Sequence, residues 1–272
     1  MRKKILLILI PIFFGCSNLK YLDAFDGLNG SPKEIESTTY KIEYNDNLII
    51  EKATSKSINF YDSKGKSIKR LNFEPDGSPS WGSVYYFYDM FGNVIKKKIF
   101  NADGSEHSQI KYKYNEYGQE IERIYSWGLT KTIYDRKNRI AEINTKNNND
   151  SLKYFERQKF DKKWNEIELI EFDNIGKQKS RIEFDYDTKG NQIKSSWYNS
   201  DDILHVIYIS TFNNKNNRTS IKKYRIVSSK PKLIEDTKIE YKYDKKGNLI
   251  EDKYILNEKT SWINRYKIKY MW

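Results

Sequence analysis

The stretch Tyr186-Asp187-Thr188-Lys189-Gly190-Asn191 is a clear copy of the motif that decides the fold of this chain. The motif is an aromatic residue, Asp or Asn, two variable residues, Gly and a polar residue. Asp or Asn can bind the backbone two residues further on, and Gly supplies the positive φ that a short hairpin needs. We therefore interpret the motif as a turn. The residues with this structural role are Tyr61, Asp62, Gly65, Tyr88, Asp89, Gly92, Tyr114, Gly118, Tyr186, Asp187, Gly190, Tyr243, Asp244 and Gly247.

The copies recur at a nearly fixed period, and such a period usually decides a fold before any single residue does. From position 61 to position 212, successive copies lie 26 or 27 residues apart, except that the copy at Tyr134 follows the previous one by 20. The last step, to Tyr243, is 31 because residues near 228–232 are inserted. A second, looser turn follows several copies by twelve residues, as at Phe172-Asp173-Asn174-Ile175-Gly176.

Between the turns, apolar and charged residues alternate, as in Ile182-Glu183-Phe184-Asp185-Tyr186. This alternation is typical of a strand with one buried face and one wet face. Consecutive hairpins predict an all-β fold, an antiparallel up-and-down meander of roughly fifteen strands of about 5 to 8 residues. A sheet this wide with one aromatic face cannot lie flat in water. We expect it to coil or to close like a barrel, so that the aromatic face covers itself.

Three copies depart from the motif at the Gly position. Asn138 and Asn216 stand there in two copies, and Asn tolerates the same left-handed conformation. Trp164 stands there in a third copy, and for this copy we predict a wider or bulged turn.

The chain begins MRKKILLILIPIFFGC, a positive start followed by ten apolar residues at 5–14. This run is too short for a spanning helix, which takes about 20 residues, but it suits a secretory signal. Phe13-Phe14-Gly15-Cys16 resembles a bacterial lipobox, which implies that Cys16 is lipidated. We therefore divide the chain into a signal peptide (1–15), a lipidated Cys with a flexible tether (16–35) and a repeat domain (36–272). An ordinary secretory signal or an uncleaved anchor are the alternatives.

The formal net charge is +12, and loss of the three signal-peptide cations would leave +9. A basic chain normally suggests nucleic acid as a partner, but export excludes it. Anionic lipid, lipopolysaccharide and acidic polysaccharide are the remaining electrostatic candidates. The simpler explanation is that Lys alternates with apolar residues along strands, so that the charge covers a solvated sheet face.

The strongest copies resemble the YD-repeat, or Rhs-like, family. The resemblance rests on Tyr88-Asp89-x-x-Gly92-Asn93, Tyr186-Asp187-x-x-Gly190-Asn191 and Tyr243-Asp244-x-x-Gly247-Asn248, the last followed by Leu249-Ile250. It covers about residues 58–256. Large members curl a long β-sheet into a shell around a toxin, or are associated with carbohydrate binding and cell-surface contact. For this much shorter chain, the resemblance implies a coiled β-sheet and a surface setting rather than a toxin cage.

Few residues suggest catalysis. His107 and His205 lack metal-ligand spacing and a nucleophile elbow, so we expect them to be exposed on strands or loops. We predict no enzymatic activity, no catalytic residue, no metal and no cofactor. Trp81, Trp127 and Trp164 lie near predicted turns, where exposed rings can stack on sugars; core packing is the alternative for each.

These observations predict a lipid-anchored protein of the bacterial cell envelope, held at the outer membrane on a face that the sequence does not indicate. We expect a non-enzymatic binding module for a polysaccharide, such as an anionic one, or for another envelope protein. One alternative is an integral outer-membrane β-barrel, since the alternating 266–272 segment ends in an aromatic residue. Another is an immunity or inhibitor lipoprotein against a toxin. Function is expected where the repeat breaks: at Tyr134, at Trp164 and at the insertion before Tyr243.

Overall fold

The computed structural model describes residues 28–45 and 48–271. The predicted signal peptide, Cys16 and most of the predicted tether lie outside the described residues. In the described part, eighteen antiparallel strands form one sheet, and no helix is long and apolar enough to cross a membrane. The strands are β1 (Pro32–Asn45), β2 (Leu48–Tyr61), β3 (Ser67–Phe73), β4 (Ser83–Tyr88), β5 (Val94–Phe100), β6 (Glu106–Tyr114), β7 (Glu120–Ile124), β8 (Gly128–Asp135), β9 (Ile140–Asn147), β10 (Leu152–Phe160), β11 (Glu166–Phe172), β12 (Gln178–Tyr186), β13 (Gln192–Tyr198), β14 (Leu204–Phe212), β15 (Arg218–Val227), β16 (Lys230–Tyr243), β17 (Leu249–Leu256) and β18 (Lys259–Tyr270).

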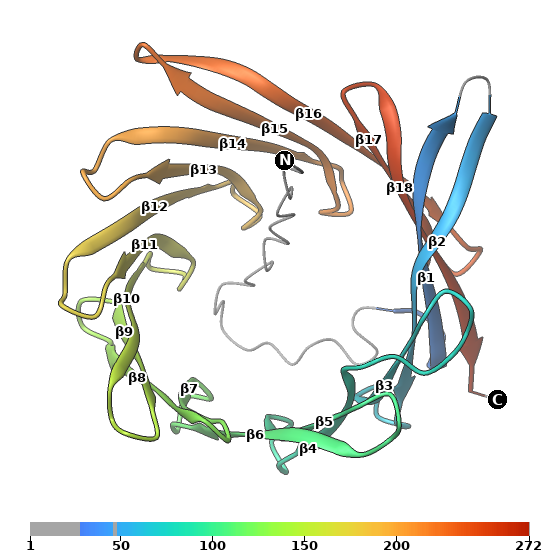
Figure 1. The fold of residues 1–272 in the computed structure, drawn as a ribbon, viewed down its shortest axis with the longest axis horizontal. Helices are drawn as coiled ribbons and strands as arrows, with labels where there is room; N and C mark the ends of the chain where they lie inside the picture. Colours follow the sequence, from blue (N-terminus) through green and yellow to red (C-terminus); the bar gives the residue numbers. More distant parts are fainter. Residues whose placement is uncertain (1–27, 46–47, 272) are drawn as a thin grey trace, which may run out of the picture.

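The sheet closes into a barrel. Each strand pairs with the next one in the chain, and β18 pairs with β1, for example Lys267 opposite Glu36 and Ile263 opposite Tyr40. Figure 1 shows the resulting ring of strands, with β18 beside β1 and β2. The predicted all-β, up-and-down meander is confirmed. The count exceeds the roughly fifteen strands expected, because the residues before the first motif copy form a hairpin of two 14-residue strands, β1 and β2.

The motif builds the turn that its residues predict. The Asp187 backbone N–H donates to the Asn191 carbonyl (2.9 Å), and the Asp187 Oδ1 accepts from the N–H groups of Lys189 (2.9 Å) and Asn191 (2.8 Å). Gly190 has φ +88°, a conformation that residues with a Cβ rarely adopt. The side-chain hydrogen bond from Asn191 helps hold the pKa of Asp187 below its usual range. The aspartates of the motif therefore serve the backbone.

The turn at Trp164 is no wider than that of a regular copy, because Trp164 has φ +63° and its N–H donates to the Asp161 carbonyl (3.1 Å). The strand register shifts between Lys159 and Phe160, but the same shift accompanies the regular copy at Tyr186. In the short copy, the positive φ falls on Arg139 (56°) instead of Asn138, whose amide binds the Asp135 carboxylate. Asn216 has φ +60°, as predicted.

The tyrosine of the motif ties neighbouring hairpins together. The hydroxyl of Tyr114 donates to the Val94 carbonyl (2.9 Å), and the hydroxyl of Tyr186 donates to the Glu166 carbonyl (2.7 Å). Both bonds connect one motif turn to the strand that follows the previous motif turn. A buried ring with a bonded hydroxyl satisfies both halves of the tyrosine side chain. This tie explains why Tyr is the preferred anchor.

The two walls of the barrel differ in character. One face of the sheet carries the aromatic anchors and buried isoleucines such as Ile182 and Ile239, which are 6% and 7% exposed. The other carries most of the charge, and its isoleucines Ile133 and Ile209 are 64% and 40% exposed. Ile263, opposite Lys253 on this charged face, is an exception at 7% exposed. Side chains converge on a concave wall and diverge on a convex one. The aromatic face is therefore the inner wall, and the charged face is the outer wall.

Ion pairs between neighbouring strands cover the outer wall. Lys242 contacts Glu251 (2.6 Å) and Arg157 contacts Glu142 (3.1 Å), each pair joining adjacent strands. Opposite charges directly across a strand pair stabilise the pairing by a few tenths of a kcal/mol, up to about 1 kcal/mol. The charge of the described strands thus lies mainly on a solvated sheet face.

Candidate binding cleft at a break in the repeat

A cleft of about 410 Å³ lies on the outer wall where the repeat is shortest. The 20-residue step to Tyr134 leaves only five residues for β7, between the nine of β6 and the eight of β8. The wall is therefore lower at β7 than beside it. The cleft extends from β7 across β8 to β9 and the turn that follows.

The turns on either side of β8 and β9 are fixed to each other at the edge of this cleft. The Asn148 N–H donates to the Trp127 carbonyl (3.0 Å), and the Asn148 Nδ2 donates to the Ser126 carbonyl (2.9 Å). Gly128 permits this approach, because a Cβ at that position would lie 2.1 Å from the Lys146 carbonyl oxygen. The rim of the cleft is therefore preorganised by backbone contacts.

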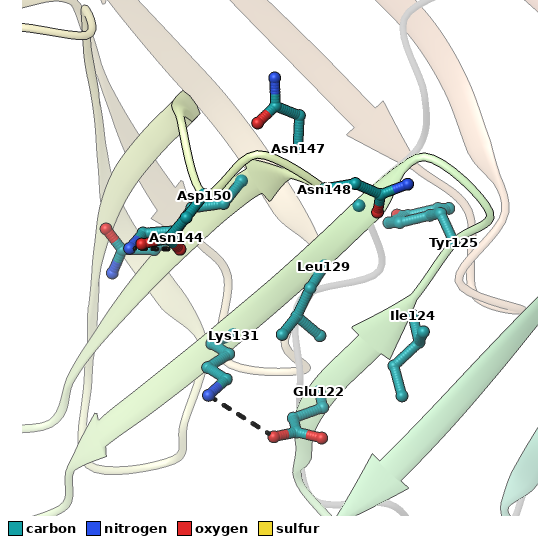
Figure 2. A pocket seen from close by; sticks show the side chains of 11 residues that line it. Glu122, Ile124, Tyr125, Leu129, Lys131, Asn144, Asn147, Asn148 and Asp150 are labelled. Atoms are coloured by element: carbon teal, nitrogen blue, oxygen red, sulfur yellow. Dashed lines mark hydrogen bonds and ion pairs between the residues drawn. The ribbon is translucent and has the colours of Figure 1, made fainter.

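The lining combines an aromatic ring with amides. Figure 2 shows Tyr125 beside Asn148 at one end of the cleft and Glu122 with Lys131 at the other. The Tyr125 ring stacks on Trp127, with centroids 4.7 Å apart and an angle of 17° between the planes. Among the described residues, no hydrogen bond involves the Asn144 side chain, which also lines the cleft. The cleft thus offers a stacking surface and free hydrogen-bonding groups side by side.

The charges in the cleft neutralise each other. Lys146 lies 2.9 Å from Asp150, and Glu122 lies 2.6 Å from Lys113, just outside the cleft, and 3.9 Å from Lys131. Two cations and two anions therefore line the same space. The arrangement favours an uncharged, hydroxyl-rich ligand over an ion.

The three tryptophans singled out from the sequence do not form one site. Trp127 is 50% exposed beside the cleft, and Trp81 is 59% exposed at the edge of a second cleft of about 300 Å³ near β1–β3. Both belong to turns on one rim of the barrel. Trp164 lies on the opposite rim, half-buried against Phe160 and the Arg136 guanidinium, with 5.4 and 5.2 Å between ring centroid and partner. Trp127 supports the first cleft through its stack on Tyr125, which lines that cleft, whereas Trp81 lines the second cleft directly.

The inner wall holds buried acids among its aromatic rings. Burial raises the pKa of Glu166 to about 8, and the nearby Glu156 carboxylate adds to this shift. The Glu166 Oε1 has no hydrogen-bond partner in the described part of the chain. Asp252, by contrast, accepts hydrogen bonds from the Tyr266 hydroxyl and the Asn264 amide, both at 2.7 Å. These acids are features of the wall, and they are not part of the cleft.

The two histidines are exposed, as expected, and His107 packs edge-on against Trp81 with ring centroids 5.6 Å apart. Within residues 28–45 and 48–271, no group of three or more His, Cys, Asp and Glu side chains is arranged to hold a metal ion.

The sequence did not point to Tyr125, Lys131, Asn144 or Asn148. The available signal was the short repeat interval, which marked this segment as a break in the pattern but not which side chains would meet there. Their meeting depends on the register between β8 and β9, where Lys131 faces Asn144.

No family model and no curated protein matches this chain. Among solved structures, it is similar to a porin-like protein from Bacteroides uniformis, at 9% identity and a TM-score of 0.32, over 88% of this chain and 96% of that one. A porin-like protein from Bacteroides vulgatus gives 12% identity and a TM-score of 0.29, over 89% and 99%. The Photorhabdus luminescens Tc holotoxin pore gives 9% and 0.35, over 79% of this chain but 15% of that chain. TM-scores this low do not imply a shared function.

Proposed function

We propose that this protein is a non-enzymatic binding module of the bacterial cell envelope, with a glycan as its ligand. The observation that carries the proposal is the cleft on the outer wall, whose lining combines the Tyr125 ring, stacked on Trp127, with the amide of Asn144, which has no hydrogen-bond partner among the described residues. Sugar rings have an apolar face and many hydroxyls. They suit a site that pairs an aromatic surface with a few convergent polar groups. Because its charges are paired, the cleft favours an uncharged sugar unit, even if the polysaccharide carries anionic groups elsewhere.

The sequence also supports the proposed location of the protein in the cell envelope. The lipobox resemblance at Cys16 suggests a lipid anchor in the envelope, and the YD-like motif suggests a surface setting. We therefore propose that the protein is anchored through Cys16 and that the repeat domain stands at the membrane surface. Metabolic labelling with a palmitate analogue tests this anchor: the wild-type chain should be labelled, and a Cys16→Ser variant should not.

A glycan array with the purified protein tests the ligand. We expect binding that is lost in Trp127→Ala and in Tyr125→Ala, because each removes half of the aromatic stack. Tyr117→Ala is the matched control, since Tyr117 is a similarly exposed aromatic residue (56%) on the opposite rim. A blank array, or equal loss in Tyr117→Ala, would contradict the proposal.

An integral outer-membrane barrel is the second candidate, favoured by the closed antiparallel barrel with an even number of strands. Spanning barrels place an apolar band on the outside, whereas the outer wall here carries ion pairs such as Lys253–Glu240 (3.5 Å). Carbonate extraction of membranes distinguishes the two proposals. A Cys16→Ser chain that resists extraction would support the spanning barrel.

A further inference from the structure

The end of the β1–β2 hairpin is a two-stranded ribbon whose base is covered, since Ile42 is 7% exposed, and whose far part is open. Pairing of β1 with β18 ends at Lys41, and pairing of β2 with β3 starts at Lys56. From Ile42 to Asn45 and from Leu48 to Glu51, the two strands therefore pair with each other alone. Figure 1 shows the paired ends of β1 and β2 at the upper right of the ring. A two-stranded hairpin gains little stability by itself in water. The stability of the ribbon therefore does not explain which side chains it carries.

This ribbon is apolar where it is most exposed. Leu48, Ile49 and Ile50 are 68%, 69% and 43% exposed, and Tyr44 across from them is 46% exposed. Successive residues of a strand point to opposite faces. Apolar side chains therefore project from both faces of the ribbon. A groove on a partner protein would cover one face, whereas insertion into a lipid surface covers both.

Neighbouring turns on the same rim extend this surface. In a meander, the β15–β16 and β17–β18 turns lie on the same rim as the β1–β2 turn. Val227 (50%) and Leu233 (45%) are exposed near the first of these turns, and Leu256 (36%) near the second. The Lys259 ammonium lies 5.9 Å from the centre of the Tyr44 ring, which joins the β17–β18 turn to the β1–β2 ribbon.

Lysines accompany the apolar residues. Lys230 and Lys232 are exposed around the β15–β16 turn, as is Lys52 on the ribbon, and none of them forms an ion pair with a described residue. The acids of the ribbon have partners: Glu43 pairs with Lys41 (3.2 Å) and Glu51 with Arg265 (2.6 Å). Glu258 in the β17–β18 turn is the exposed acid without an ion pair near these turns, against Lys52, Lys230 and Lys232. This part of the rim therefore presents a surplus of unpaired positive charge beside apolar side chains, which complements an anionic lipid surface.

We infer that this rim docks onto an anionic phospholipid bilayer, with the tip of the β1–β2 ribbon inserted among the lipids and the lysines at the headgroups. This contact is additional to the proposed anchor at Cys16. It uses the β1–β2, β15–β16 and β17–β18 turns, whereas the glycan cleft adjoins the β7–β8 and β9–β10 turns elsewhere on the same rim. The contact would fix the orientation of the barrel on the membrane.

A fluorescent label at the ribbon tests this inference separately from any effect of the N-terminal segment. In a Cys16→Ser background, Ile49→Cys and Phe91→Cys each provide one thiol for the dye NBD. Phe91 is a matched control because it is 68% exposed, against 69% for Ile49, and lies on the opposite rim. With vesicles of phosphatidylcholine and phosphatidylglycerol, we expect brighter, blue-shifted emission from position 49 and no change from position 91. No change at position 49, or equal changes at both, would overturn the inference.

The lysines provide a second, independent readout. Lys230→Ala with Lys232→Ala should weaken binding to the anionic vesicles by roughly fivefold per lysine. Binding to pure phosphatidylcholine should change little. These substitutions lie at exposed positions of a turn, so folding should be preserved and can be checked by circular dichroism. Unchanged affinity for the anionic vesicles would contradict a role for charge in this docking.

Discussion

The same residue type behaves differently on the two walls of the barrel. Ile182 on the inner wall is 6% exposed, whereas Ile133 on the outer wall is 64% exposed, although both lie within strands of similar alternation. The difference comes from curvature, because closure of the sheet crowds one face and opens the other. Most of the buried apolar contacts therefore lie on the inner wall. Away from buried positions such as Ile263, the outer wall is accessible to water and to ligands.

Replacing one isoleucine on each wall by aspartate should give the largest difference in stability between the two walls. Ile182→Asp should lower the free energy of unfolding by about 3 to 5 kcal/mol, because it removes apolar contacts and buries a polar group. Ile133→Asp should cost less than about 1 kcal/mol, since its side chain stays in water opposite Glu142. Urea unfolding measures both. Similar losses for the two variants would show that the walls are not distinct.

The buried Glu166 of the inner wall should make the free energy of unfolding depend on pH. Its pKa in the folded chain is raised to about 8, so between its ordinary value and pH 8 the folded state retains a proton that the unfolded state releases. Stability contributed by this group is therefore present at low pH and lost as the pH rises. Glu166→Gln should stabilise the protein at pH 8 by on the order of 2 to 4 kcal/mol and have little effect at pH 4.

The control for this pH dependence is Glu168→Gln, two residues along β11 on the outer wall. Its free energy of unfolding should differ from that of the wild type by a similar small amount at both pH values. A pH-independent effect of Glu166→Gln would contradict the burial of an uncharged carboxyl group on the inner wall.

Removing a hydrogen bond of a motif tyrosine hydroxyl should have a smaller effect on the free energy of unfolding. Tyr186→Phe keeps the ring but removes the donor to the Glu166 carbonyl, and should cost about 1 kcal/mol. Tyr224→Phe on the outer wall, where no hydrogen bond of the hydroxyl is found among the described residues, should be nearly neutral. Thermal unfolding monitored by circular dichroism compares them, and equal shifts would argue against the tie.

The smallest effect is expected for an outer-wall ion pair. Glu142→Gln removes the partner of Arg157, but both side chains are more than 40% exposed. The change in unfolding free energy should stay within about 0.5 kcal/mol and diminish further in high salt. A loss of several kcal/mol would mean that the outer wall is less accessible to water than the structure indicates.

The sequence allowed prediction of the strands and turns because both depend on nearby residues. The alternation around Ile182 and the turn at Asp187 are local patterns, and the structure contains both. Closure was expected in general terms. The strands that close the barrel, β1 and β18, could not be identified from the sequence. Their pairing, for example Glu36 with Lys267, joins residues too far apart in the sequence for any local signal.

The candidate site was harder to predict. Tyr125 and Asn144 meet through the register of three strands, and neither residue belongs to the motif. The left-handed conformation of Trp164 was missed for another reason: a bulky residue rarely adopts it unless the surrounding turn imposes it. The Asp161 turn supplies that constraint through two backbone N–H donors to its carboxylate.

Thiol labelling tests the two-wall barrel most directly. Single cysteines at Ile133→Cys and Ile182→Cys, each in a Cys16→Ser background, can be reacted with a charged maleimide while the protein is folded. We expect rapid modification at position 133 and strong protection at position 182 until the protein is unfolded. Equal rates, or protection at position 133 with rapid modification at position 182, would contradict a closed barrel with an aromatic inner wall and a solvated outer wall.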